Sequence, residues 1–188
     1  MPILINVFSL ILLFVFMFCI SVLLLRVLGI QWAVEPPTVD DLLTIALASL
    51  SSLFLLAGGG MALSHLGLAP TSKVNSQAST ELVISVWIIG VSLAPIAEEF
   101  LFRGAIQGGL RSRFGAVTSI TAGCSLFAVA HTLNYSGTVI EVFSAVVLIG
   151  LVSVPFAISY ELTDNLTIPI ASHALYNLIF YLILFSAA

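Results

Sequence analysis

Charged residues are scarce in this sequence. Its 188 residues include five Lys or Arg and nine Asp or Glu, so that 7% are charged, whereas 60% are hydrophobic. An ordinary soluble domain has roughly 25% charged residues, which help to cover its water-exposed surface. The shortage excludes a soluble globular protein and indicates that the chain is surrounded by a lipid bilayer.

Basic patches and cysteine motifs are missing as well. A net charge of −4 leaves no cationic surface that would neutralise phosphates, so nucleic acid is excluded as a partner. Cys19 and Cys124 are the two cysteines and lie in separate apolar runs. This placement favours neither a disulfide nor a metal site built on closely spaced thiolates.

Long apolar runs are what the chain has instead. A spanning helix needs about 20 mostly apolar residues, and an open strand cannot satisfy its backbone in lipid. The predicted fold class is therefore all-α, a polytopic transmembrane helical bundle with about six spanning helices. The expected spans are residues 5–28, 41–65, 81–110, 115–133, 138–160 and 167–186.

The longest polar stretch, APTSKVNSQAST, divides these spans unequally. It predicts an N-terminal transmembrane hairpin over residues 1–70 and a four-helix core over residues 80–188. The later connections are short, and short loops make helices that are neighbours in sequence antiparallel neighbours in space.

Two places in the expected helices depart from a regular pattern. The run Gly58-Gly59-Gly60 has no side chains and predicts a close approach of another helix. Pro95 has no backbone N–H, so it leaves the carbonyl of Val91 without its usual donor. We expect a bend in the third span just after this point.

Three of the few charges stand together in the third span, in the stretch PIAEEFLFR at residues 95–103. An ionisable side chain within a bilayer costs at least a few kcal/mol and by default marks a functional site. On a helix, Glu99 and Arg103 have the i, i+4 spacing at which opposite charges pair. Glu98 lies about 100° away around the helix and needs a different partner.

A histidine in the fourth span is a candidate for that partner. The third and fourth spans form a predicted hairpin that turns near Arg113. Glu98 lies 15 residues before this turn and His131 lies 18 residues after it. At about 1.5 Å per residue, their depths in the membrane differ by only about 5 Å. The two side chains are therefore expected to face each other.

The last span carries His173 and Asn177, which share one helix face at i, i+4. His173 is only about nine residues from the turn near Asp164, so it is expected to lie shallower than Glu98. This mismatch closes if the segment 107–113 projects beyond the membrane. Each polar cluster also has a structural interpretation, as an ion pair or as a residue packed in a helix interface. This interpretation leaves the carboxylate of Glu98 without a partner. We therefore interpret the three clusters as one site.

The ordered set of motifs resembles a known family. Glu-Glu-x-x-x-Arg on one helix, Phe-x-x-x-His on the next and His-x-x-x-Asn on the last are similar to those of the CAAX-processing and bacteriocin-immunity family of intramembrane proteases. The resemblance covers roughly residues 80–186, and the short chain is closer to the compact bacterial members. It implies an integral, multi-pass protein of a bacterial or archaeal cell membrane, with the bilayer and a peptide or protein substrate as partners.

The resemblance also implies a catalytic role for each site residue. Glu98 would be the general base that activates a water together with His131. His173 and Asn177 would donate hydrogen bonds to the oxyanion, and Glu99 would be held by Arg103. The predicted activity is an intramembrane endopeptidase that cuts near the C-terminus of a membrane-associated, CAAX-type substrate, prenylated in the eukaryotic branch.

Two alternatives remain open at this point. Glu98, His131 and His173 would also suit a divalent metal such as zinc with an open position for water, so the reaction is either metal-free or metal-dependent. The other alternative is a non-hydrolytic membrane protein, either an immunity or scaffold protein that binds a peptide in the same pocket or a proton-coupled transporter. The lack of an evident internal repeat weakens the transporter hypothesis.

Overall fold

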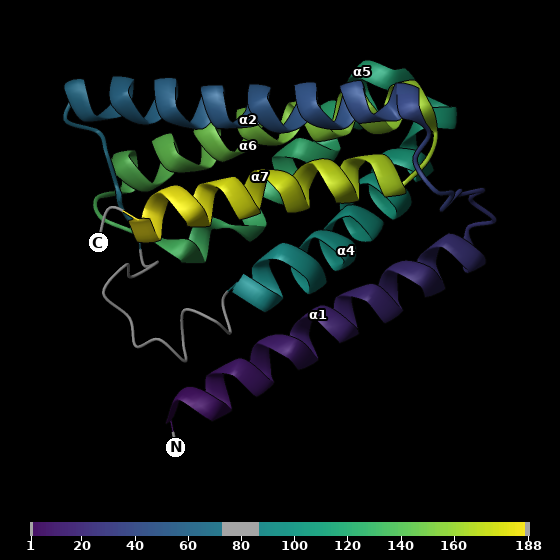
Figure 1. Ribbon diagram of the computed structural model, residues 1–188, viewed down its shortest axis with the longest axis horizontal. Coiled ribbons are helices and arrows are strands. Elements are labelled where there is room, and N and C mark those ends of the chain that lie inside the picture. Colours follow the sequence, from purple (N-terminus) through teal and green to yellow (C-terminus); the bar gives the residue numbers. More distant parts are fainter. Residues whose placement is uncertain (1, 73–86, 187–188) are drawn as a thin grey trace.

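The computed structural model describes residues 2–72 and 87–186, which form a bundle of long helices (Figure 1). Two short strands, β1 and β2, pair antiparallel, with Thr71 opposite Ser136 and Ser72 opposite Tyr135. The elements follow one another as α1 (Pro2–Val27), α2 (Val39–His65), β1 (Thr71–Ser72), η1 (Ile89–Leu93), α4 (Ala94–Glu99), η2 (Phe100–Gly108), α5 (Gly109–Ala130), η3 (Thr132–Asn134), β2 (Tyr135–Ser136), α6 (Val139–Thr163) and α7 (Thr167–Ser186).

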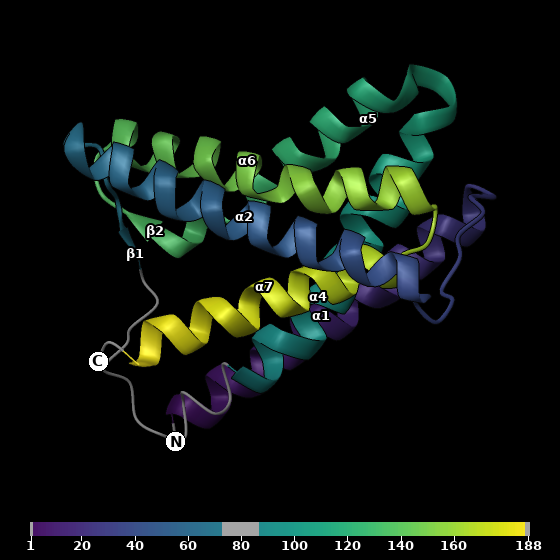
Figure 2. The same cartoon turned by 45° about the horizontal axis from the view of Figure 1, so that its top comes forward.

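Within the described residues, five helices are long and apolar enough to span a membrane. The longest, Ile89–Asn134, contains 46 residues and is broken at Gly115, where φ is 75° and ψ is 173°. Glycine adopts this positive φ without the steric cost that a side chain brings. The chain reverses there, so that η2 and α5 run side by side (Figure 2). The expectation of about six spans in an all-α polytopic bundle is thus confirmed, whereas residues 81–86 and most of the polar stretch after β1 lie outside the described part.

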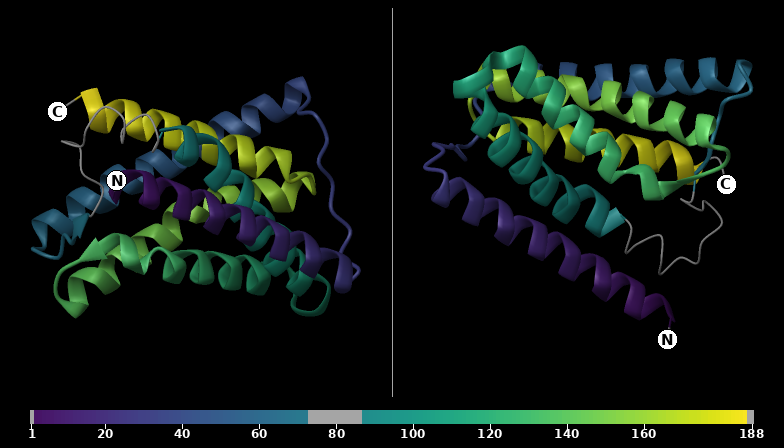
Figure 3. Two further views of the ribbon diagram at one scale, coloured as in Figure 1. Left: turned by 90° about the horizontal axis from the view of Figure 1, so that it is seen from below. Right: turned by 180° about the vertical axis from the view of Figure 1, so that it is seen from behind.

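The first two helices do not form the hairpin expected over residues 1–70. Helix α1 packs against η1, α4 and η2, whereas α2 packs against α6 and α7. The two helices lie on opposite faces of the bundle, with the other helices between them (Figures 1 and 3). The division of the chain into 1–70 and 80–188 therefore remains a prediction about sequence segments and does not describe two packed units.

The separation has a physical cause in the connection between the two helices. Residues 28–38 form an extended segment that is tied to the turn between α6 and α7. The backbone N–H of Leu166 donates to the carbonyl of Ala33 at 2.9 Å. The Asn165 side chain exchanges two hydrogen bonds of 3.1 Å with the backbone of Glu35. This connection spans the bundle, so α2 begins far from the end of α1.

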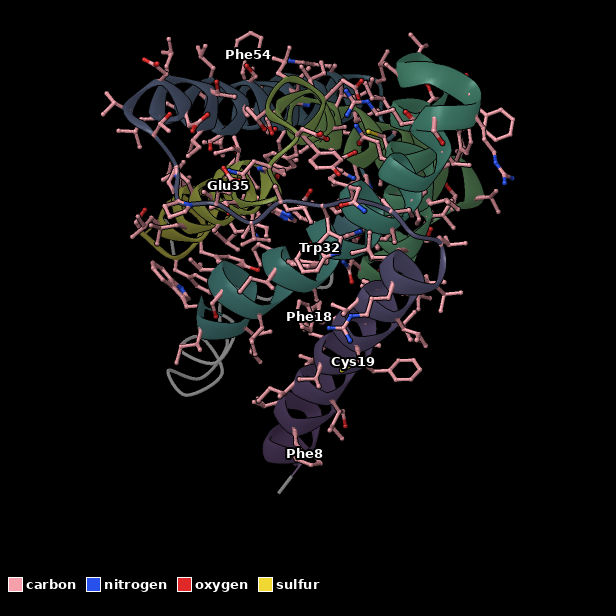
Figure 4. The ribbon with its side chains drawn as sticks, turned by 90° about the vertical axis from the view of Figure 1, so that its right-hand side faces the viewer. Phe8, Phe18, Cys19, Trp32, Glu35 and Phe54 are labelled. Atoms are coloured by element: carbon pink, nitrogen blue, oxygen red, sulfur yellow. The ribbon has the colours of Figure 1, made fainter. Side chains whose placement is uncertain are left out.

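Aromatic side chains hold α1 and the following connection against the core. Phe18 of α1 and Trp32 both pack edge-on against Phe100, at ring-centroid distances of 4.9 and 5.4 Å. Figure 4 shows the two labelled side chains beside the same helix. Edge-to-face aromatic pairs of this kind contribute about 0.5–1.5 kcal/mol beyond their burial.

Several polar residues outside the predicted site serve helix formation and packing. The capping boxes Thr38 with Asp41 and Thr138 with Glu141 begin α2 and α6, which accounts for these two acidic residues. Buried Ser49 donates to the carbonyl of Ser172 in α7 at 2.8 Å, a contact between helices that suits a membrane bundle.

Two glycines allow helices to approach closely. A Cβ placed on Gly59 would overlap the Leu148 side chain of α6, whereas a Cβ placed on Gly58 or Gly60 would meet open space. The glycine run therefore serves packing at one of its three positions. A Cβ placed on Gly123 of α5 would lie 3.2 Å from the backbone oxygen of Phe102, so the hairpin of η2 and α5 depends on the missing side chain.

We predict that Gly123→Leu destabilises the protein by about 1–3 kcal/mol, the usual cost of overpacking, because the added side chain meets a backbone oxygen that cannot move aside. Thermal unfolding in detergent measures the effect. Gly58→Leu is the control, because Gly58 is exposed and has open space around it. Equal midpoints for the two variants would contradict the packing argument.

Candidate active site

The segment that carries Glu98, Glu99 and Arg103 alternates between α-helical and π-helical turns. Helix α4 contains both glutamates and is flanked by the π-helices η1 and η2, with Arg103 in η2. π-turns are rare and occur frequently at functional sites. A π-helical turn immediately precedes α4, whereas the bend expected just before Glu98 stays a prediction.

Glu99 is the centre of a buried chain of polar groups. Its Oε2 lies 3.1 Å from Nε of Arg103, so the ion pair expected from the i, i+4 spacing is confirmed. Its Oε1 accepts a hydrogen bond of 2.9 Å from Nδ1 of His173. Glu99 and Arg103 are fully buried, and His173 is 4% exposed. Glu99 thus joins α4 to η2 and to α7.

The contact between Glu99 and His173 was not expected from the sequence. The two residues are 74 positions apart, so no local spacing could signal that they meet. The i, i+4 spacing predicts only Arg103 as a partner of Glu99, and in the structure His173 is a second partner.

Glu98 faces two imidazole rings from different helices. The Nε2 atoms of His131 and His173 each lie 3.9 Å from the same atom, Oε2 of Glu98. This distance is too long for a direct hydrogen bond. One water molecule between the carboxylate and a ring would make bonds of normal length to both. The structure therefore brings Glu98 together with both predicted histidines.

The other ring nitrogens fix the orientation of the two imidazoles. Nδ1 of His131 lies 2.8 Å from the carbonyl oxygen of Phe127. A carbonyl only accepts hydrogen bonds, so Nδ1 of His131 carries the proton and a neutral ring has its lone pair on Nε2. The same argument holds for His173, whose Nδ1 faces the ion-paired carboxylate of Glu99. His173 can donate from Nε2 only when both of its nitrogens are protonated.

The side chains of His173 and Glu98 meet, although residue counting placed His173 shallower. Nε2 of His173 lies 3.9 Å from Oε2 of Glu98. The segment 107–113 does not project as a whole, because Gln107 is fully buried and donates to the carbonyl of Ala157 at 3.0 Å. The nine π-helical residues of η2 advance less along the axis than nine α-helical residues would, since each turn holds more residues. The π-helix therefore removes part of the difference in depth that counting at the α-helical rise predicts.

Asn177 lies one turn beyond His173 and makes a contact that the sequence did not suggest. Its Nδ2 donates a hydrogen bond of 2.7 Å to the carbonyl oxygen of Gly90 in η1. An amide nitrogen carries two hydrogens, so one N–H remains for the cavity that Asn177 also lines.

A cavity of about 350 Å³ contains the reactive atoms of the site. Glu98, His131, His173 and Asn177 lie at its polar part, and its other walls are mainly apolar and aromatic. Helix α1, which had no assigned role, contributes to these walls. The wall residues include Val7, Leu10, Phe14, Leu56, Tyr135, Tyr176, Phe180 and Tyr181. A second, larger hollow surrounds Gly29 and Arg111 and contains none of the predicted site residues.

Tyr181 is a wall residue that the sequence analysis missed. It follows His173 and Asn177 at the same spacing of four residues, so the pattern of α7 contained the signal. Tyr135, which strand β2 contributes to the wall, had no such signal.

The described part of the chain contains no preformed cluster of ligands for a metal ion. Among residues 2–72 and 87–186, no three His, Cys, Asp or Glu side chains are arranged to hold a metal ion. Two imidazoles and a carboxylate are chemically suitable ligands for zinc, but their described spacing does not gather them around one point.

Comparison with known proteins gives one match. A family model described as type II CAAX prenyl endopeptidase, Rce1-like, matches residues 80–179, which are 100 of the 188 residues. No curated protein and no solved structure matches the chain.

We predict that Glu99→Gln lowers the free energy of unfolding by about 3–5 kcal/mol, because it leaves the buried guanidinium of Arg103 without its countercharge. The neighbouring Glu98→Gln is the matched control, because Glu98 has no ion pair with an arginine or lysine among the described residues. Thermal unfolding of both variants in the same detergent checks this. A Glu99→Gln variant as stable as Glu98→Gln would contradict the assigned network.

Proposed function

The chain belongs to the family of Rce1-like type II CAAX prenyl endopeptidases, and we propose that it is an intramembrane endopeptidase that uses a glutamate-activated water. The observation that carries the proposal is the position of one Glu98 oxygen opposite two imidazole nitrogens, inside a cavity walled by membrane helices. The protein is an integral, multi-pass membrane protein. We propose a bacterial or archaeal cell membrane as its location.

In the proposed reaction, a water molecule lies between Oε2 of Glu98 and Nε2 of His131. Glu98 takes one proton from this water as general base, while the lone pair on His131 accepts its other hydrogen and orients it. The water oxygen attacks the peptide carbonyl carbon. As the tetrahedral intermediate collapses, Glu98 returns the proton to the leaving amine. No covalent intermediate with the protein forms.

The developing oxyanion needs hydrogen-bond donors that are already in place. Two are proposed: the second N–H of Asn177, and Nε2–H of His173 in its doubly protonated form. Glu99 accepts from Nδ1 of His173 and stabilises the resulting positive charge. Arg103 neutralises Glu99 in turn, so the two adjacent glutamates have different roles.

The substrate proposed for this site is a membrane-associated peptide that is cut near its C-terminus. The apolar and aromatic walls of the cavity suit a lipid-modified or hydrophobic segment, and the polar part suits a peptide backbone. A prenylated CAAX-type peptide combines both properties.

We further propose that the reaction needs no metal ion. Water activation is assigned to Glu98 and His131, and no step of the mechanism passes through a metal. Because Glu98, His131 and His173 are also chemically suitable zinc ligands, chelation is a direct test of this proposal.

We predict that Glu98→Gln lowers cleavage of a fluorogenic farnesylated CAAX peptide at least about 100-fold, because the amide cannot take up the proton of water. Purified protein in lipid nanodiscs provides the assay. Glu141→Gln is the matched control and should retain full activity, since glutamine also serves in a capping box.

The same pair of variants separates the protease from its main alternative. If a membrane peptide is bound by the protein and Glu98→Gln leaves both binding and the cellular effect unchanged, the protein is a non-hydrolytic immunity or scaffold protein. New peptide ends that depend on Glu98 would identify the natural substrate by mass spectrometry of membranes.

We predict that cleavage persists after treatment with EDTA and 1,10-phenanthroline, and that elemental analysis finds less than one zinc per protein molecule. Loss of activity that only added zinc restores would overturn the metal-free mechanism. A zinc metalloprotease assayed in the same buffer controls for effective chelation.

A further inference from the structure

The π-helix η1 contains a carbonyl oxygen that has no backbone donor in the register that η1 adopts. In an α-helix, the carbonyl of Gly90 would accept from the N–H of Ala94. The N–H of Ala94 instead donates to Ile89, five residues earlier. In that register the donor for Gly90 would be residue 95, which is a proline and has no N–H. In the register of η1, Pro95 therefore leaves the backbone carbonyl of Gly90 without a donor, whereas an α-helical count pointed to Val91.

The side chain of Asn177 fills this position from another helix. Its Nδ2 lies 2.7 Å from the Gly90 oxygen, a short and direct hydrogen bond. A carbonyl that is open in a membrane helix is costly and needs such a partner. The bond also fixes which end of the amide faces η1, because the Asn177 oxygen would repel the carbonyl. The amide of Asn177 thus has one orientation.

Gly90 is also needed for close packing of α7 at this point. A Cβ placed on Gly90 would lie 2.5 Å from the hydroxyl oxygen of Tyr181, one turn beyond Asn177. The missing side chain allows Asn177 and Tyr181 to approach the backbone of η1 together.

We propose that Pro95 and Gly90 are positioning residues for Asn177: Pro95 opens the Gly90 carbonyl, and this carbonyl holds the Asn177 amide so that its second N–H points to the oxyanion. The proposal rests on the proposed role of Asn177 as an oxyanion donor. A donor that is already oriented stabilises the transition state without a reorganisation cost. Pro95 therefore acts on the rate of the chemical step and leaves substrate binding largely unchanged.

The test is Pro95→Ala, assayed with a fluorogenic farnesylated CAAX peptide and the full chain in nanodiscs. In the register of η1 the new N–H can donate to the Gly90 oxygen, and in an α-helical register the N–H of Ala94 does so. In either case a backbone donor competes with Asn177 for this oxygen. We expect kcat to fall roughly tenfold, less than the loss of a whole oxyanion donor, with KM changed by less than about twofold. Alanine is the strongest helix former, so the variant is expected to fold. Pro95→Leu, which also restores the N–H, should give the same result.

Two further variants separate this inference from a purely structural effect. Pro155→Ala removes a proline from the interior of α6, at a residue that does not line the cavity, and should leave kcat unchanged. In an Asn177→Ala background, Pro95→Ala should cause no further loss, because the residue through which it acts is gone.

The outcomes are distinguishable. A full tenfold loss on top of Asn177→Ala, or no loss in Pro95→Ala alone, overturns the positioning role and leaves the proposed function in place. If Asn177→Ala instead keeps the wild-type kcat, Asn177 is not an oxyanion donor. In that case the proposed function loses one donor, and the role of Pro95 is refuted with it.

Discussion

The ion pair between Glu99 and Arg103 is the interaction on which the rest of the site depends. Both side chains are fully buried, and the pair connects to three other helices. Glu99 accepts from His173 of α7, Nη2 of Arg103 donates to the carbonyl of Ser153 in α6 at 3.0 Å, and the guanidinium lies over the ring of Phe127 in α5. Because an unpaired charge is so costly in this environment, these helices are held in one arrangement.

Adjacent glutamates acquire different chemistry from this arrangement. Glu99 is paired with the guanidinium of Arg103 and serves as an anchor. Glu98 has no ion pair with an arginine or lysine among the described residues and faces two imidazoles at 3.9 Å, which suits the proton transfer proposed for it. Two neighbouring carboxylates in different environments commonly take different acid–base roles. The division follows from their positions about 100° apart around one helix.

The sequence predicted the features that depend on local spacing or on composition. Hydropathy predicted the spans, and the i, i+4 rule predicted the pair of Glu99 with Arg103. It did not predict the contacts of Glu99 with His173 or of Asn177 with Gly90, because each joins residues more than 70 positions apart. The π-helical turns were also not predicted, and they account for part of the difference between the counted depth of His173 and its contact with Glu98. The sequence also did not predict that α1 and α2 pack against different helices, because the contacts of the connecting segment with Asn165 and Leu166 join residues distant in sequence.

The polar atoms of the site divide into those that are committed to a partner and those that are not. Both Nδ1 atoms of the histidines, the carboxylate of Glu99 and one N–H of Asn177 are engaged by fixed groups. The uncommitted atoms include Oε2 of Glu98, the two Nε2 atoms and the second N–H of Asn177, and the residues that carry these atoms all line one cavity. Hydrolysis in a membrane requires water only where these atoms meet. The His131 side chain is 23% exposed, against 10% for Glu98 and 5% for His173, so of these three groups His131 is the most open to the surroundings of the bundle.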